Sequence, residues 1–192
     1  MPDSMTEQVA RAPRRRPQQL SLIVLGLGIG VAAVVVAWFV LQGGSSNKVS
    51  PNDRPVIVSQ AQLEHFASGL DYPLYWAGPK TGFSYELTAA NGRAWVRYLP
   101  AGVGAGDPRS DFLVVGTYKQ PHSYANLRRA ADRAGSVSRK IDGSGLMVYS
   151  AAKPTSVYFG YPGSDFQVEV YTHSTTTARS LVLAGAIKPL GQ

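Results

Sequence analysis

The feature that most constrains this 192-residue chain is an uncharged apolar stretch from Leu20 to Leu41, LSLIVLGLGIGVAAVVVAWFVL. A helix of that length reaches roughly 33 Å, enough to cross the ~30 Å hydrocarbon core of a membrane. The glycine-rich run from Gly26 to Gly30 also suggests a dinucleotide-binding loop, but Val31 stands where that fingerprint needs its third glycine. The stretch therefore predicts a transmembrane helix over residues 20–41.

Basic residues flank the predicted span mainly on one side. Four arginines lie between residues 11 and 16, whereas the segment after the span has little net charge. The positive-inside rule then predicts a cytoplasmic basic tail over residues 1–19 and places everything after the span outside the cytoplasm. The span is longer than the apolar region of a secretory signal, and its end, AWFVLQGG, lacks a small-residue cleavage motif. We expect an uncleaved signal anchor in the cell membrane.

Small residues recur at helical spacing along the predicted span. Gly26 and Gly30 form a G-x-x-x-G pair, and Ala33 and Ala37 continue the same face. Such a face allows two helices to approach closely, which predicts a homodimer through the membrane. The alternative is that glycine and alanine are simply common in membrane helices.

The rest of the chain has the size of one ordinary domain. Residues 42–55, rich in Gly, Ser, Asn and Pro, are typical of a linker, and residues 56–192 follow as a single extracytoplasmic domain. The chain has no cysteine, and a domain of this length can be stable without disulfides. The whole chain has a net charge of +7, which is compatible with anionic lipid headgroups or envelope polymers.

The clearest local signal in this domain is the Asn91-Gly92 pair at the middle of residues 83–100, FSYELTAANGRAWVRYLP. Asn-Gly is typical of a two-residue hairpin turn. The turn predicts three cross-strand pairs: Tyr85 with Tyr98, Leu87 with Val96, and Glu86 with Arg97. Because both faces of the hairpin then carry matched side chains, the pattern favours this register.

Cap and stop signals predict the neighbouring elements. A capping box at Ser59 begins a short helix that ends at Gly69. Residues 111–119, DFLVVGTYK, are apolar on both faces and predict a central strand. Residues 123–134 then show helical spacing of apolar side chains, with Gly135 as the stop signal.

The second half of the domain repeats the order of these sequence features. Residues 85–100 align with residues 147–162, and the Ser-Asp-Phe sequence that begins at Ser110 recurs at Ser164. A last helix is expected to start near Ser174. The similarity predicts an internal duplication, with chance as the alternative because the identities are few.

These elements together predict an α+β fold. We expect two repeats of one helix and three strands, over residues 59–119 and 123–173, followed by a closing helix. The strands are expected to pair mainly antiparallel, and the helices to cover one face of the sheet.

Motifs for catalysis or cofactor binding are absent from the sequence. The three histidines, His65, His122 and His173, have no zinc-ligand spacing, and there is no nucleophile elbow or phosphate loop. No cofactor or metal is expected. An envelope hydrolase with a site assembled from distant residues stays open as an alternative. It would be favoured if two or more of the three histidines, Asp111 and Asp165 met around one pocket.

One candidate binding surface is basic. The segment RRAADRAGSVSRK carries five positive side chains: Arg128, Arg129, Arg133, Arg139 and Lys140. On one surface they would hold the phosphates of a lipid or an anionic envelope polymer. Nucleic acid is not expected as a partner. A solvated helix face is the alternative interpretation.

A second candidate surface is aromatic. The segment DYPLYWAGPKTGF places Tyr72, Tyr75 and Trp76 between prolines and glycines, with Lys80 nearby. Aromatic rings on a loop can stack on sugars or cap a groove. The alternative is that these rings cover the core where the first helix meets the hairpin.

An arginine-led anchor, a short linker and a cysteine-free domain with the sequences YWAGPKTGFSYELT and RAWVRYLP occur together here. In this combination the chain resembles signal-anchored envelope proteins of high-GC Gram-positive bacteria, a group without an assigned activity. The resemblance carries no functional residues. The sequence as a whole predicts a noncatalytic binding or assembly module of the cell envelope. A hydrolase, or an interaction partner that dimerises through its span, remain as alternatives.

Overall fold

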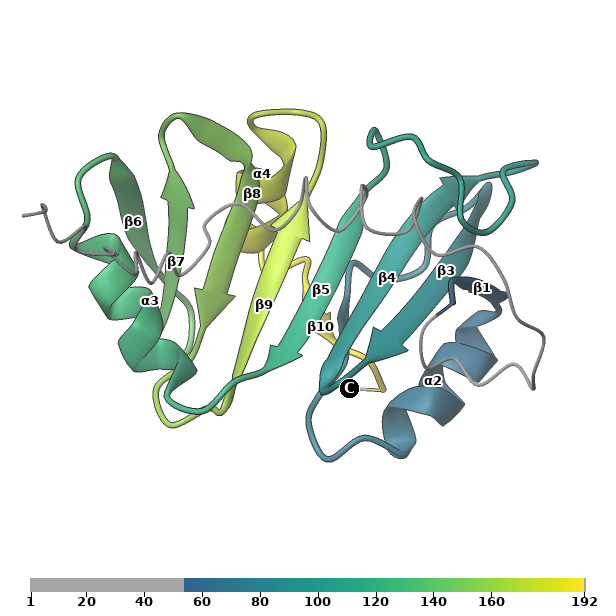
Figure 1. The fold of residues 1–192 in the computed structure, drawn as a ribbon, viewed down its shortest axis with the longest axis horizontal. Coiled ribbons are helices and arrows are strands. Elements are labelled where there is room, and N and C mark those ends of the chain that lie inside the picture. Colours follow the sequence, from purple (N-terminus) through teal and green to yellow (C-terminus); the bar gives the residue numbers. More distant parts are fainter. Residues whose placement is uncertain (1–53, 192) are drawn as a thin grey trace, which may run out of the picture.

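The computed structural model describes residues 54–191, which form an α+β domain (Figure 1). The predicted tail, the span with Gly26, Gly30, Ala33 and Ala37, and most of the linker lie outside the described residues. Among residues 54–191 no helix is long and apolar enough to cross a membrane.

A single eight-stranded antiparallel sheet organises the domain, with the strand order β1-β3-β4-β5-β9-β8-β7-β6. In that order the strands are Val56–Val58, Phe83–Ala90, Arg93–Pro100, Val114–Lys119, Phe166–Tyr171, Lys153–Gly160, Gly145–Ser150 and Ser136–Ile141. Three helices accompany the sheet: α2 (Gln60–Ser68), α3 (Ser123–Ala131) and α4 (Thr177–Leu183). A short ribbon pairs β2 (Tyr75–Trp76) with β10 (Lys188–Pro189).

The hairpin of β3 and β4 has the predicted register. Leu87 pairs with Val96 and Glu86 pairs with Arg97. The turn residue Asn91 has a φ of 51°, and the glycine after it has a φ of 73°. Two successive left-handed residues are what a type I′ turn requires, and they explain why Asn-Gly is favoured there. The capping box that begins α2 at Ser59 is also confirmed.

Two three-stranded meanders meet at the centre of the sheet. The strands β3, β4 and β5 form the first meander, β7, β8 and β9 form the second, and β5 pairs with β9 (Figure 1). The expected duplication holds only for this strand order. The second unit has an additional strand, β6, between its helix and its meander. The register of β7 with β8 also shifts between Tyr149 and Ser150, because Tyr149 pairs with Val157 whereas Ser150 pairs with Lys153. Val157 and Phe159 therefore face the core, rather than the residues aligned with Val96 and Tyr98.

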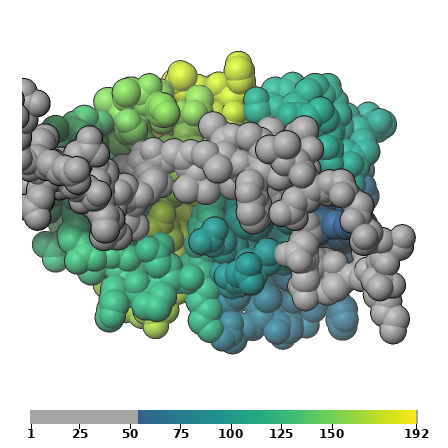
Figure 2. All heavy atoms as spheres, viewed as in Figure 1, coloured from purple at the N-terminus to yellow at the C-terminus, as the bar shows by residue number. Residues whose placement is uncertain are grey.

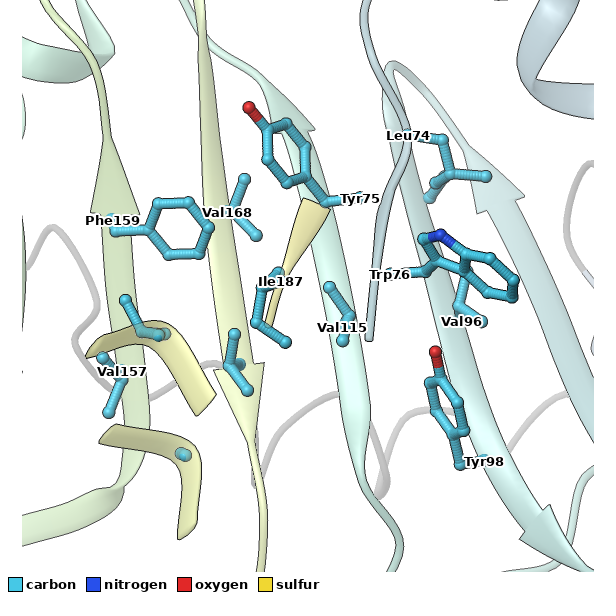
Figure 3. Packing of buried hydrophobic residues seen from close by; sticks show 14 of the residues in the cluster. Leu74, Tyr75, Trp76, Val96, Tyr98, Val115, Val157, Phe159, Val168 and Ile187 are labelled. Carbon is cyan, nitrogen blue, oxygen red and sulfur yellow. The ribbon is translucent and has the colours of Figure 1, made fainter. Parts of the chain in front are cut away.

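The main hydrophobic core lies on one face of the sheet, under α2, α4 and the β2–β10 ribbon. Figure 3 shows Tyr75, Trp76 and Ile187 gathered against side chains of the sheet such as Val115 and Val168. All five of these residues are at most 7% exposed. Burial of this many large apolar side chains is the dominant favourable contribution to folding.

The expectation that the helices cover one face of the sheet is wrong for α3. On β7, Met147 faces the main core, while Val148 points to the opposite face. There Val148 and Tyr158 form a second apolar patch, which Leu127 of α3 covers. Because the strands β7 and β8 are apolar on both faces, they require a cover on both sides. The helix α3 lies over β6, β7 and β8 and reaches the neighbouring strand β9, but it leaves β3, β4 and β5 without a helix on this side (Figure 1).

Candidate functional site

The half of the sheet that α3 leaves uncovered is the candidate site. We call this surface the open face: the side of β3, β4, β5 and β9 that points away from the main core. In the space-filling view from the same side, α3 lies at the lower left and the connection of residues 101–112 at the upper right (Figure 2). The open face contains two hollows between these two borders, and both are lined by residues of the sheet.

The first hollow is a pocket of about 100 Å³ between the sheet and the connection of residues 101–112. We call it the aromatic pocket, because four of its lining residues are the rings of Trp95, Phe112, Tyr118 and Tyr171. They come from β4, the 101–112 connection, β5 and β9. The strand residues Trp95, Tyr118 and Tyr171 point to one side of the sheet because side chains alternate along each strand.

A buried ion pair fixes the wall of the aromatic pocket. The Nη1 atom of Arg97 lies 2.9 Å from Oε1 of Glu86, and the two side chains are 15% and 3% exposed. Arg97 also donates to the carbonyl oxygens of Asp107 and Arg109, at 2.8 and 2.7 Å. The amide of Gly106 donates to the second carboxylate oxygen of Glu86 at 2.6 Å. The pair thus anchors the 101–112 connection over the sheet.

A second buried carboxyl group, that of Glu169 on β9, lies in the lining of both hollows. Tyr118 donates a hydrogen bond to one of its oxygens, and Tyr158 donates to the other at 2.9 Å. Burial raises the pKa of Glu169, although both tyrosine hydrogen bonds oppose that shift. Burial, followed by the neighbouring Glu169 carboxylate, also raises the pKa of Tyr118 and of Tyr158. A raised pKa means that each of these three side chains favours its neutral form.

The second hollow is a groove of about 400 Å³ between α3 and the sheet. We call it the basic groove. Arg93 from β4, Arg129 from α3 and Arg133 from the turn after α3 line it. Lys119 lines it as well, with its ammonium group paired to Asp71. Arg93, Arg129 and Arg133 are all exposed to solvent. Arginines from the sheet and from the end of α3 thus line one hollow.

The structure separates the five basic residues that the sequence groups together. Arg129 and Arg133 line the basic groove, whereas Arg128 does not. Arg139 and Lys140 lie on β6, where successive side chains point to opposite faces of the sheet. The five residues do not form one patch, because the segment after α3 is an edge strand rather than a continuation of the helix.

The aromatic segment before the first hairpin belongs to the core. Tyr75 and Trp76 are only 5% and 7% exposed and pack in the main cluster (Figure 3). Burial raises the pKa of Tyr75 to about 12. Tyr72 is half-buried, and the exposed Lys80 lies 4.0 Å from the ring centroid of Phe83. The structure thus supports the alternative in which these rings cover the core.

Histidines line neither hollow of the described structure. His65, His122 and His173 are exposed, as are Asp111 and Asp165. The backbone amide of His122 donates to Oδ1 of Asp165 at 3.3 Å, but neither residue lies at the pocket or the groove. Within residues 54–191 no group of three His, Asp or Glu residues is arranged to hold a metal ion.

Sequence reasoning missed Trp95, Tyr118, Glu169 and Arg93 as site residues. A weak signal was present for one of them. Glu169 is the one charged residue of the strand FQVEVY and lies between two valines, and a charged residue there must find partners when it is buried. Its partners Tyr118 and Tyr158 lie on other strands, so only the pairing of β5 with β9 and of β9 with β8 brings them together.

Comparisons of this chain with protein-family models, with curated proteins and with solved structures give no match. Its function is therefore argued from the geometry of the open face.

Proposed function

We propose that this chain is a membrane-anchored, extracytoplasmic binding module of the cell envelope whose basic groove binds phosphate groups. One observation carries the proposal: Arg93 of β4 lines the same groove as Arg129 and Arg133, which come from the end of α3 and the turn after it. Such a cluster of guanidinium groups favours a multivalent anion, because arginine forms paired hydrogen bonds with phosphate oxygens.

The surroundings of the groove are consistent with an anionic ligand. Glu169, which lines the groove, accepts hydrogen bonds from two tyrosines, and Asp71 is paired with the lining residue Lys119. The whole chain is basic, with a net charge of +7. A positive groove on a basic protein raises the local concentration of anions and their association rate.

The location follows from the predicted anchor. An uncleaved span over residues 20–41 with a cytoplasmic tail would hold the domain at the outer surface of the membrane. Two envelope components carry phosphate there, namely anionic polymers and lipid headgroups. Both present the same chemistry to the groove. The condition that would favour a hydrolase is not met among the described residues, since none of the three histidines, Asp111 and Asp165 lines either hollow.

The experiment measures binding to the full-length protein in a neutral detergent at low and high salt. One arm uses a soluble glycerol-phosphate polymer, and the other uses glycerophosphoglycerol, the free headgroup of an anionic lipid. The test variant is Arg129→Glu/Arg133→Glu, and the matched control is Arg128→Glu/Arg139→Glu, which changes the charge equally outside the groove.

We expect the groove variant to bind at least one of the two probes about tenfold more weakly than the control variant does. Salt should weaken binding to the unchanged protein. The probe that binds with the higher affinity indicates whether the phosphate comes from a polymer or from a lipid headgroup. Equal losses in both variants, or no binding of either probe, would overturn the proposal.

A further inference from the structure

The two hollows are arranged along the same strands. On β4, Trp95 lines the aromatic pocket and Arg93, two residues away, lines the basic groove. On β9, Tyr171 lines the pocket and Gln167 lines the groove, and Glu169 between them lines both. Residues two apart on a strand are about 7 Å from each other on one face. An apolar hollow and a basic one therefore adjoin on the open face.

The buried polar side chains around the aromatic pocket already have partners within the protein. Glu86 and Arg97 satisfy each other and the 101–112 connection. The indole nitrogen of Trp95 donates to the hydroxyl of Tyr118 at 3.0 Å, and that hydroxyl donates to Glu169. Among the described residues no buried side-chain nitrogen or oxygen lacks a partner. A ligand in this pocket would make mainly apolar contacts, since few hydrogen-bonding groups are free to receive it.

We propose that the two hollows bind one amphiphile, a lipid phosphate, with part of its hydrocarbon chain in the aromatic pocket and its phosphate in the basic groove. This inference rests on the proposed function and deepens it, because it selects a lipid rather than a polymer as the source of the phosphate. The adjacency of an apolar pocket and a cationic groove matches the two halves of such a molecule.

The position of the pocket relative to the predicted anchor also favours a lipid. Pro55, at the end of the predicted linker, is one of the pocket's lining residues. A fully extended linker over residues 42–55 reaches at most about 50 Å. The pocket therefore stays within reach of the surface of the membrane in which the chain is predicted to be anchored.

The test compares three small probes by calorimetry on the full-length protein in a neutral detergent, with protein-free micelles as the blank. Hexyl phosphate carries both halves of the proposed ligand, inorganic phosphate carries the head alone, and hexanol carries the tail alone. Burial of the hexyl chain should make hexyl phosphate bind about tenfold more tightly than inorganic phosphate, or better. Equal affinities would overturn the inference while leaving the phosphate groove in place.

Two substitutions of similar size test where the hydrocarbon chain of the ligand binds. Val114→Phe on β5 would fill the aromatic pocket, whereas Ile57→Phe adds a ring on the same sheet face at a residue that lines neither hollow. We expect Val114→Phe to reduce the affinity for hexyl phosphate to that for inorganic phosphate, and Ile57→Phe to leave both affinities unchanged. If Val114→Phe leaves the preference for hexyl phosphate intact, the hexyl chain does not occupy the aromatic pocket, and the inference is overturned.

A spectroscopic readout checks the same placement without relying on affinity. Bromine quenches indole fluorescence on contact, and Trp95 lines the pocket. In a Trp38→Phe background, which removes the tryptophan of the predicted span, hexyl phosphate with a terminal bromine should quench the fluorescence. In the Trp38→Phe/Trp95→Phe variant the quenching should disappear. Quenching that survives there would overturn the inference. If the unchanged protein binds hexanol but neither inorganic phosphate nor hexyl phosphate, the proposed function is overturned instead.

Discussion

The indole nitrogen of Trp95 donates a 3.0 Å hydrogen bond to the hydroxyl of Tyr118, and the two rings meet edge to face with centroids 5.8 Å apart. The strand residue beneath this contact is Gly116. A Cβ atom built there would lie 2.9 Å from Cδ1 of Trp95 and 2.9 Å from the Tyr118 hydroxyl oxygen. The contact thus depends on the absence of a side chain at this position, which also leaves Tyr118 free to reach Glu169.

Replacing Gly116 with alanine should destabilise the domain and disturb the open face. Both neighbouring atoms belong to aromatic side chains whose polar groups are hydrogen-bonded, so relief requires moving a ring. We expect the free energy of unfolding to fall by about 1–3 kcal/mol. Urea denaturation followed by tryptophan fluorescence measures this. Gly104→Ala is the matched control, because nothing lies within 4 Å of its Cβ position. Equal stabilities of the two variants would contradict the claim that the contact of Trp95 with Tyr118 requires glycine at position 116.

The buried carboxyl group of Glu169 should make stability depend on pH. Its pKa is raised in the folded state, mainly by burial, so between the unfolded and folded pKa values the folded chain holds more protons. Its contribution is fully present below the unfolded pKa of about 4.3 and decreases as the pH rises through the folded pKa. We expect Glu169→Gln to remove this part of the pH-dependent decrease in the free energy of unfolding. Denaturation of both proteins across pH 4 to 9 measures it, and parallel curves would disprove the expectation.

The ion pair of Glu86 and Arg97 should be coupled strongly in a double-mutant cycle. Replacing Arg97 with methionine leaves the buried Glu86 carboxylate without its cation, which costs about 3–5 kcal/mol. Adding Glu86→Gln removes that unpaired charge, so the double variant should be more stable than Arg97→Met alone. Chemical denaturation of the four proteins gives the coupling energy. A double variant as unstable as the sum of the two single changes would show that the pair is not coupled.

The same ion pair should control the 101–112 connection. Arg97 holds the carbonyl oxygens of Asp107 and Arg109, so its loss should release that loop. Trypsin cleavage after Arg109 should then become faster in Arg97→Met than in the unchanged protein, since proteolysis follows local opening. Cleavage at the same rate in both would show that other contacts hold the loop.

Local signals in the sequence predicted the local parts of the fold. The Asn91-Gly92 turn determined the register of β3 and β4, and with it the pairing of Glu86 with Arg97. Ser59 and Gln62 marked the start of α2. In each case the decisive interaction joins residues close in the chain or across one tight turn, so the pattern contains the information.

Features that depend on distant pairing could not be predicted in this way. The apolar residues on both faces of β7 are visible in GLMVYS, but nothing local states which helix covers which face. The two hollows arise because β5 pairs with β9, which brings Tyr118 to Glu169. For the same reason the basic segment after residue 127 looked continuous, although a turn and the strand β6 divide it.

The aromatic segment before the first hairpin provides a last test, because its two interpretations predict different losses. Trp76 is 7% exposed and packs edge to face on Tyr85. Trp76→Ala should therefore reduce the free energy of unfolding by about 3–5 kcal/mol. It should leave the affinity for phosphate probes unchanged, since this face lies behind the sheet from both hollows. Tyr72→Ala, at a half-buried ring, is the comparison and should cost less. If Trp76→Ala leaves stability intact but abolishes binding, the segment is a ligand surface rather than part of the core.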